Sequence, residues 1–86
     1  MIIYKITNKI NGKIYIGQTK FTAKKRFKQH AKADTFIGRA IRKYGADNFK
    51  IEVVEICKNA LELNEREIFW IEYFNCKVPN GYNIAD

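Results

Sequence analysis

One carboxylate interrupts an apolar helical pattern in the second half of the chain. Glu67 lies in a predicted helix over residues 60–74, and its neighbours on a helical wheel are Leu63, Phe74 and Ile71. A carboxylate in such surroundings is costly unless a metal, a cation or hydrogen bonds compensate it. The position therefore indicates either a functional site or a structural ion pair with a basic residue of the first half.

Two further polar side chains lie at the border of a predicted core. Arg26 and His30 are four residues apart on a helix expected over residues 23–33, and they flank its apolar stripe. A planar guanidinium suits a phosphate or carboxylate oxygen, and histidine has an ordinary pKa close to neutrality. The two side chains therefore border the core rather than facing bulk solvent, a position typical of a lone histidine.

Two tyrosines complete the set of candidate residues. Tyr4 and Tyr15 lie on predicted strands over residues 2–7 and 13–17, which an Asn-Gly turn at residues 11–12 joins into a hairpin. The hairpin can bring the phenols close together, but both also fit a role as sheet aromatics. A phenol with an ordinary pKa of about 10 is a poor base at neutral pH. It becomes one only where a metal or neighbouring cations lower that pKa, as the basic first half could do.

Local signals predict three further elements. A helix is expected from residue 34 or 35 to residue 44 with Gly45 after it, followed by a strand over 49–56 and by the 60–74 helix, which Asn59 opens. The inner face of the first of these is expected to carry Phe36, Ala40 and Tyr44. Together the elements predict a small α+β domain with a three-stranded antiparallel sheet flanked by about three helices.

Length and composition exclude several classes of protein. A chain of 86 residues makes one domain, and 47% apolar residues suffice for a packed core rather than a disordered segment. No run approaches the ~20 apolar residues of a membrane span, so we expect a soluble cytoplasmic protein without a membrane partner. Cys57 and Cys76 lack a C-x-x-C spacing, which favours reduced, buried thiols over a zinc cage.

The positive charge is concentrated in the first half of the chain. Residues 1–50 carry a net charge of +11 and residues 51–86 a net charge of −4, within a total of +7. The segment over residues 20–32 holds no acidic residue and six basic ones: Lys20, Lys24, Lys25, Arg26, Lys28 and Lys32. Such a segment can bind nucleic acid in a salt-sensitive way, or it can simply be a solvated helix face.

Five short motifs, taken in order, resemble the GIY-YIG nuclease domain. They are Ile3-Tyr4, Tyr15-Ile16-Gly17, Arg26 with His30, the run Glu65-Arg66-Glu67-Ile68-Phe69-Trp70-Ile71, and Asn80-Gly81-Tyr82-Asn83. The resemblance covers nearly the whole chain and is greatest to the catalytic domains of phage and intron-encoded homing endonucleases. Ile2 replaces the glycine that opens the first motif, which affects local strand packing more than chemistry because that glycine is not a side-chain catalyst.

The resemblance implies a metal-dependent DNA endonuclease that hydrolyses phosphodiester bonds. In that mechanism Glu67 holds a single divalent cation, Mg²⁺ or Mn²⁺, and Arg26 binds a nonbridging phosphate oxygen. Tyr4 activates or orients the attacking water, with Tyr15 and with His30 as a proton relay. The ordinary pKa of His30 suits a base at neutral pH better than that of Tyr4, so the part of His30 in activating the water can be larger.

The resemblance also implies supporting residues. Asn83 is expected to hydrogen-bond within the site or to hold the C-terminal tail, and the absence of a side chain at Gly17 is expected to let the nucleic-acid backbone approach. Four lysines of the basic segment are expected to contact DNA: Lys24, Lys25, Lys28 and Lys32.

The expected organisation is a single catalytic domain over residues 1–86 without a separate DNA-targeting domain. We expect DNA as partner, no small-molecule cofactor, a monomer or weak dimer, and an intracellular protein of phage or viral origin. Two other interpretations remain open. The chain can be a noncatalytic nucleic-acid-binding module that uses the helix around residues 20–32, or an interaction domain in which Glu67 makes only a structural salt bridge.

Overall fold

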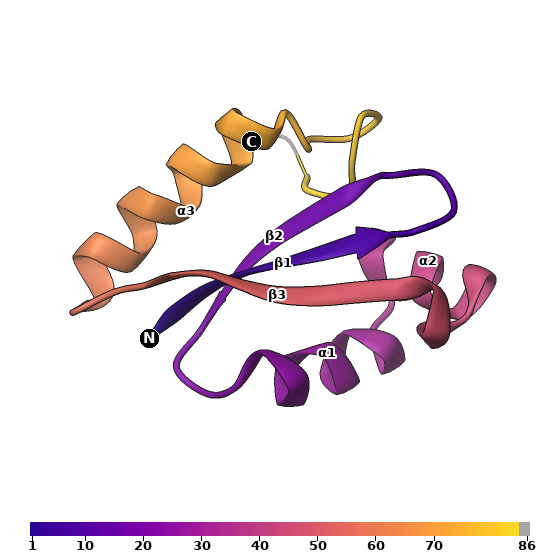
Figure 1. The fold of residues 1–86 in the computed structure, drawn as a ribbon, viewed down its shortest axis with the longest axis horizontal. Helices are drawn as coiled ribbons and strands as arrows, with labels where there is room; N and C mark the ends of the chain where they lie inside the picture. Colours follow the sequence, from indigo (N-terminus) through magenta and orange to yellow (C-terminus); the bar gives the residue numbers. More distant parts are fainter. Residues whose placement is uncertain (85–86) are drawn as a thin grey trace.

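Three antiparallel strands form the centre of the molecule (Figure 1), and the computed structural model describes residues 1–84. They are β1 (Ile2–Asn8), β2 (Ile14–Thr19) and β3 (Phe49–Ile56), in the order β2-β1-β3. Gly12 in the β1–β2 turn has a φ of 77°, a value that glycine adopts without strain. The predicted hairpin and the predicted antiparallel sheet are therefore confirmed.

Three α-helices flank this sheet, as expected. They are α1 (Ala23–Lys32), α2 (Phe36–Tyr44) and α3 (Ala60–Phe74), and a short 3₁₀ turn, Ala46–Asn48, precedes β3. Each α-helix begins after a polar side chain that accepts a hydrogen bond from a free backbone N–H of the first turn. These N-cap residues are Thr22, Thr35 and Asn59.

The helices lie on opposite faces of the sheet (Figure 1), so the core is divided into two layers. Tyr4 and Ile6 of β1 pack against α1 and α2, while Ile3, the neighbour of Tyr4 in the strand, packs with Leu63 of α3. Successive side chains of a strand point to opposite faces, so β1 contributes to both layers. Ile2 pairs with Thr19 on one side and with Ile56 on the other, so the strand is continuous where the motif lacks its glycine.

The expected inner face of α2 is wrong at one position. Phe36 is 46% exposed, whereas Ile37, Ala40 and Ile41 are buried. The apolar arc of this helix is centred between Ile37 and Ile41, and Phe36 lies at its edge in the first turn. The aromatic ring is therefore left at the surface of α2.

The C-terminal tail is hydrogen-bonded to the outer edge of β2. The backbone N–H of Tyr82 donates to the carbonyl of Ile14 at 2.9 Å. The side chain of Asn83 accepts from the N–H of Ile16 at 2.9 Å and donates to its carbonyl at 2.8 Å. A Cβ on Gly81 would lie 2.6 Å from the Ile14 carbonyl oxygen, so only glycine permits this approach. The tail thereby fixes the outer edge of β2.

Candidate active site

Two tyrosines and a histidine meet on the face of the sheet that α1 covers. Tyr4 is fully buried and His30 is 4% exposed, and the Tyr4 hydroxyl lies 2.7 Å from Nε2 of His30. The Tyr15 ring lies edge-on to the imidazole, with 5.0 Å between ring centroids, and 6.3 Å from the Tyr4 ring. Because β1, β2 and α1 each contribute one member, this cluster exists only in the folded protein.

Gly17 makes room for one of these rings. It lies opposite Tyr4 in the β1–β2 pairing, and a Cβ at this position would overlap Cζ and the hydroxyl oxygen of Tyr4. We expected the missing side chain to admit a nucleic-acid backbone. The structure corrects this expectation, because the space is filled by the Tyr4 phenol.

The electrostatic environment of Tyr4 also differs from the expectation. Burial raises the pKa of the Tyr4 phenol, the nearby Tyr15 raises it further, and the opposing effect of Arg26 is smaller. Burial likewise raises the pKa of Tyr15. Arg26 of the basic first half does lower the pKa of Tyr4, but burial outweighs that effect and the pKa is raised overall. Both phenols carry their protons at neutral pH.

His30 is neutral in this environment. Burial lowers its pKa to about 4, and the positive charge of Arg26 acts in the same direction. A neutral imidazole has one donor and one acceptor nitrogen, so Tyr4 and His30 share one proton between oxygen and Nε2. The pair is suited to passing a proton along that bond.

Arg26 lies on the same side of α1 as His30 and is half-buried. Its Nη1 donates to Oε1 of Gln29 at 2.8 Å, one helical turn away. Arg26 lines the same cavity as Tyr15 and His30, and its charge lowers the pKa of Tyr4, Tyr15 and His30. The guanidinium thus provides a fixed positive charge beside the tyrosine–histidine cluster.

Glu67 approaches the cluster from α3 and is half-buried. Its Oε1 accepts a hydrogen bond from Nε2 of Gln18 at 3.2 Å. Burial raises the pKa of Glu67 and the Gln18 bond lowers it, while the carboxylate itself raises the pKa of both Tyr4 and Tyr15. The structural salt bridge is not found, since none of the four ion pairs within residues 1–84 includes Glu67.

A cavity of about 280 Å³ opens beside Arg26 and His30. The N-terminal turn of α2 and the tail complete its walls, which are formed by Tyr15, Arg26, His30, Ala33, Thr35, Phe36, Ile37, Tyr82, Asn83 and Ile84. Thr35 and Phe36 were not predicted from the sequence to lie at the site. The only signal that marks Phe36 is structural: it is an apolar side chain that is left at the surface. Arg26 and His30 therefore face a common cavity.

Asn83 holds the tail rather than offering free polar atoms. Its amide makes both hydrogen bonds with the backbone of Ile16, and Sγ of Cys76 lies 3.1 Å from its Oδ1. Of the two roles expected for this residue, the geometry favours the second. Asn83 keeps β2, and with it Tyr15, next to the cavity.

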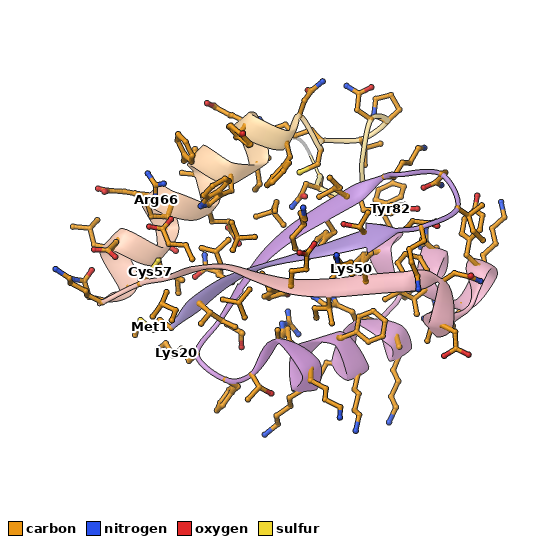
Figure 2. The ribbon with its side chains drawn as sticks, in the orientation of Figure 1. Met1, Lys20, Lys50, Cys57, Arg66 and Tyr82 are labelled. Atoms are coloured by element: carbon orange, nitrogen blue, oxygen red, sulfur yellow. The ribbon has the colours of Figure 1, made fainter. Side chains whose placement is uncertain are left out.

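The lysines of α1 lie on a different side of the helix from Arg26 and His30. Lys24, Lys28 and Lys32 border a second hollow of about 400 Å³, whose floor contains Phe27 and Ala31. In Figure 2 the long side chains of α1 extend away from the sheet, and Lys25 lies 4.8 Å above the Phe21 ring. The expected DNA contacts at these four lysines therefore belong to a surface separate from the cluster.

A second group of potential metal ligands lies near the start of α3. The ligand atoms of Glu55, Cys57 and Glu62 all lie within 4.8 Å of one another. Glu55 is already occupied, because its Oε1 accepts from Arg66 and from Trp70. Cys57 and Cys76 are both buried free thiols, as expected. The sequence does not reveal this group, because Cys57 lacks the C-x-x-C spacing by which metal-binding cysteines are usually identified.

The arrangement has counterparts among known proteins. The sequence matches the GIY-YIG catalytic domain over residues 1–83. The chain belongs to the GIY-YIG family. It is 38% identical over 92 aligned residues to "Intron-associated endonuclease 1" of Enterobacteria phage T4, an alignment that covers 98% of this chain and 36% of the relative. The chain thus spans about a third of the length of the curated relatives it matches.

Solved GIY-YIG structures have the same fold. The catalytic domain of the homing endonuclease I-TevI superposes with a TM-score of 0.81 at 37% identity, covering 98% of this chain and 97% of that one. A mutant of the I-TevI domain gives the same TM-score and identity, with 92% of its chain covered. The predicted family and fold are confirmed. GIY-YIG nucleases generally depend on a divalent metal, and no helix within residues 1–84 is long and apolar enough to cross a membrane.

Proposed function

We propose that this GIY-YIG domain is a metal-dependent endonuclease that hydrolyses phosphodiester bonds of DNA. The observation that carries the proposal is that Tyr15, Arg26 and His30 line one cavity, that Tyr4 is hydrogen-bonded to His30, and that the charge of Glu67 on α3 acts on both phenols. A guanidinium, a proton-sharing pair and an unpaired carboxylate are the groups that phosphodiester hydrolysis needs. The match to catalytic domains of intron-encoded endonucleases supports the same activity.

Arg26 binds the substrate in this proposal. Its guanidinium is fixed in charge and faces the cavity beside His30, and such a group forms strong hydrogen bonds to phosphate oxygens. The developing charge on the phosphate in the transition state strengthens that interaction. Arg26 therefore both positions the phosphodiester and stabilises the transition state.

Tyr4 and His30 move the proton. The Tyr4 oxygen takes a proton from the attacking water while its own proton passes along the 2.7 Å bond to Nε2 of His30. This relay does not require a phenolate, so it is compatible with the raised pKa of Tyr4. The negative phosphate raises the pKa of the imidazole when substrate binds, which makes His30 a better acceptor. Tyr15 packs against the imidazole and holds it.

Glu67 is the proposed ligand of a divalent cation. It is a half-buried carboxylate whose Oε1 has one amide donor and no ion pair within residues 1–84, so it fits a hard cation such as Mg²⁺ or Mn²⁺. Such a cation supplies Lewis-acid stabilisation of charge on the phosphate and the leaving oxygen. We further propose that this catalytic domain acts as a monomer or weak dimer inside a phage-infected cell.

Incubation with supercoiled plasmid and MgCl₂ tests the proposal. We expect nicked and linear products with the chain as it stands, and none with EDTA or with Glu67→Ala. Cleavage that persists in Glu67→Ala would contradict the metal role. A chain that retards plasmid without ever cutting it, in either Mg²⁺ or Mn²⁺, would contradict the endonuclease.

One observation favours a second candidate function. Lys24, Lys28 and Lys32 form a positive face apart from the cluster, which is suited to a noncatalytic contact with the DNA backbone. In that case the triple change Lys24→Ser, Lys28→Ser, Lys32→Ser weakens DNA binding and flattens its salt dependence by about 3 units of slope, even in Glu67→Ala. Binding by the triple variant with an unchanged salt dependence would exclude this surface.

A further inference from the structure

Gln18 connects the edge strand of the sheet to the carboxylate of α3. Its side chain leaves β2 on the face opposite to Tyr15 and Gly17, which is the face that α3 covers. Nε2 of Gln18 lies 2.8 Å from Oδ1 of Asn64 and 3.2 Å from Oε1 of Glu67. One amide group therefore joins two side chains of α3.

The chemistry of these groups determines how the amide is oriented. An ionised carboxylate only accepts hydrogen bonds, so Gln18 must present its NH₂ group to Glu67. That group carries two hydrogens, and the second one meets the carbonyl oxygen of Asn64. Asn64 and Glu67 are three residues apart on α3 and so share one face of the helix. The contact with Asn64 keeps Gln18 from turning its own carbonyl oxygen towards the carboxylate.

Two bonds from a partly exposed amide contribute little to the attachment of α3. Leu63 and Cys76 are 2% and 1% exposed and, with Ile71 and Phe74, form the apolar contact that holds the helix on the sheet. The Gln18 bonds instead fix a single atom, Oε1 of Glu67. No hydrogen bond to the other oxygen, Oε2, is formed within residues 1–84, so that oxygen remains available to a cation.

We propose that Gln18 is a positioning residue which, anchored by Asn64, holds the Glu67 carboxylate in the orientation that binds the divalent cation. This inference rests on the proposed function, since it assumes that Glu67 is the metal ligand. Groups that hydrogen-bond to metal ligands typically change metal affinity or activity about 10- to 100-fold when they are removed. Neither Gln18 nor Asn64 belongs to the five motifs on which the resemblance rests.

Mn²⁺ binding to the metal-free chain, followed by the electron paramagnetic resonance of free Mn²⁺, tests the role of Gln18 without relying on activity. Gln18→Leu keeps the side-chain volume and removes the donor, and we expect it to weaken Mn²⁺ binding about 10-fold. Asn64→Ala should weaken it less, and Asn64→Asp, which still accepts the hydrogen bond, should come closer to the unchanged protein. In plasmid cleavage Gln18→Leu should need more Mg²⁺ while its affinity for DNA stays the same.

The control is Ile71→Val, which loosens the packing of α3 by one methylene and keeps the hydrogen bond between Gln18 and Glu67. If Gln18→Leu lowers stability as Ile71→Val does and leaves Mn²⁺ affinity unchanged, Gln18 is a structural tie and the inference is wrong. If Gln18→Leu binds Mn²⁺ normally while Glu67→Ala does not, the proposed metal site stands and only the inference fails. If Glu67→Ala binds Mn²⁺ as well as the unchanged chain, the metal role of Glu67 fails and the inference with it.

Discussion

Two half-buried glutamates, Glu55 of β3 and Glu67 of α3, have opposite environments. Oε1 of Glu55 accepts hydrogen bonds from Nε of Arg66 at 2.7 Å and from Nε1 of Trp70 at 2.9 Å. Oε1 of Glu67 accepts from the neutral amide of Gln18 alone within the described residues. The arginine bond lowers the pKa of Glu55, whereas burial raises the pKa of Glu67.

The hydrogen-bond partners distinguish the structural carboxylate from the other one. Glu55 has a cation and two donors, so its charge is compensated within the fold. Glu67 lies near Tyr4 and Tyr15 and has no cation to compensate its charge, as is typical of carboxylates in functional sites. Burial alone does not separate the two glutamates, but their hydrogen-bond partners do.

The largest expected effect distinguishes the two glutamates by activity. Glu67→Gln should lower the rate of plasmid cleavage by about 1000-fold, because a metal-stabilised charge in the transition state is lost. Its thermal unfolding midpoint should stay the same or rise, since active-site groups are rarely optimal for stability. Glu55→Gln should do the reverse, keeping the cleavage rate and lowering the midpoint. Equal losses of activity in both variants would remove the distinction.

A smaller effect is expected at the tyrosine beside the Glu67 region. Tyr4→Phe keeps the ring that Gly17 accommodates and removes the hydroxyl bonded to His30. We expect kcat for a duplex substrate to fall about 100-fold with little change in DNA affinity, because general acid–base steps contribute this much. Tyr73→Phe is the matched control, since Tyr73 is 66% exposed and stacks on Phe69. If the two variants cleave equally fast, Tyr4 does not relay the proton.

The smallest expected effect is on the pH dependence of stability, measured by denaturant unfolding in EDTA. Because the pKa of Glu67 is raised in the folded state, the folded chain binds a proton there more readily than the unfolded chain does. The contribution of Glu67 to the free energy of unfolding is therefore greatest below its ordinary pKa of about 4.3. It is lost as the pH rises through the pKa of the folded state. For Glu55 the native pKa is lowered, so its contribution is present above about 4.3 and is lost as the pH falls through the native pKa.

Substitution should therefore change the two pH profiles in opposite directions. Glu67→Gln removes the decrease in stability on the alkaline side of pH 4.3, and Glu55→Gln removes the decrease on the acidic side. Profiles that change in the same direction would show that the two carboxylates have similar environments, against the distinction drawn from their partners.

The elements of the fold follow from short-range signals in the sequence. The Asn-Gly turn at residues 11–12 and the caps Thr22, Thr35 and Asn59 act within four residues, so their effect is legible without the tertiary structure. The grouping of Tyr4, Arg26, His30 and Glu67 was accessible only through the order of the family motifs. Hydrophobic periodicity and charge alone did not determine the role of any of these residues.

Other features depend on contacts between distant residues and were not predictable. Gln18 meets Glu67 across 49 positions of sequence, and no local pattern indicates that pairing. The direction of the shift in the Tyr4 pKa was not predictable from the sequence, because burial outweighs the lowering effect of Arg26. Gly17 was predicted to lie against DNA because its true neighbour, Tyr4 on the adjacent strand, can be identified only when the strand register is known. Each error arises from packing, which composition and periodicity do not specify.

The most direct test of the central claim is the position of Mn²⁺ in a crystal of this chain, located by anomalous scattering. We predict a peak within coordination distance of Glu67, on the side of Tyr4 and Arg26, that disappears in Glu67→Gln. A peak at Glu55, Cys57 and Glu62, with none at Glu67, would contradict the assignment of Glu67 as the catalytic metal ligand.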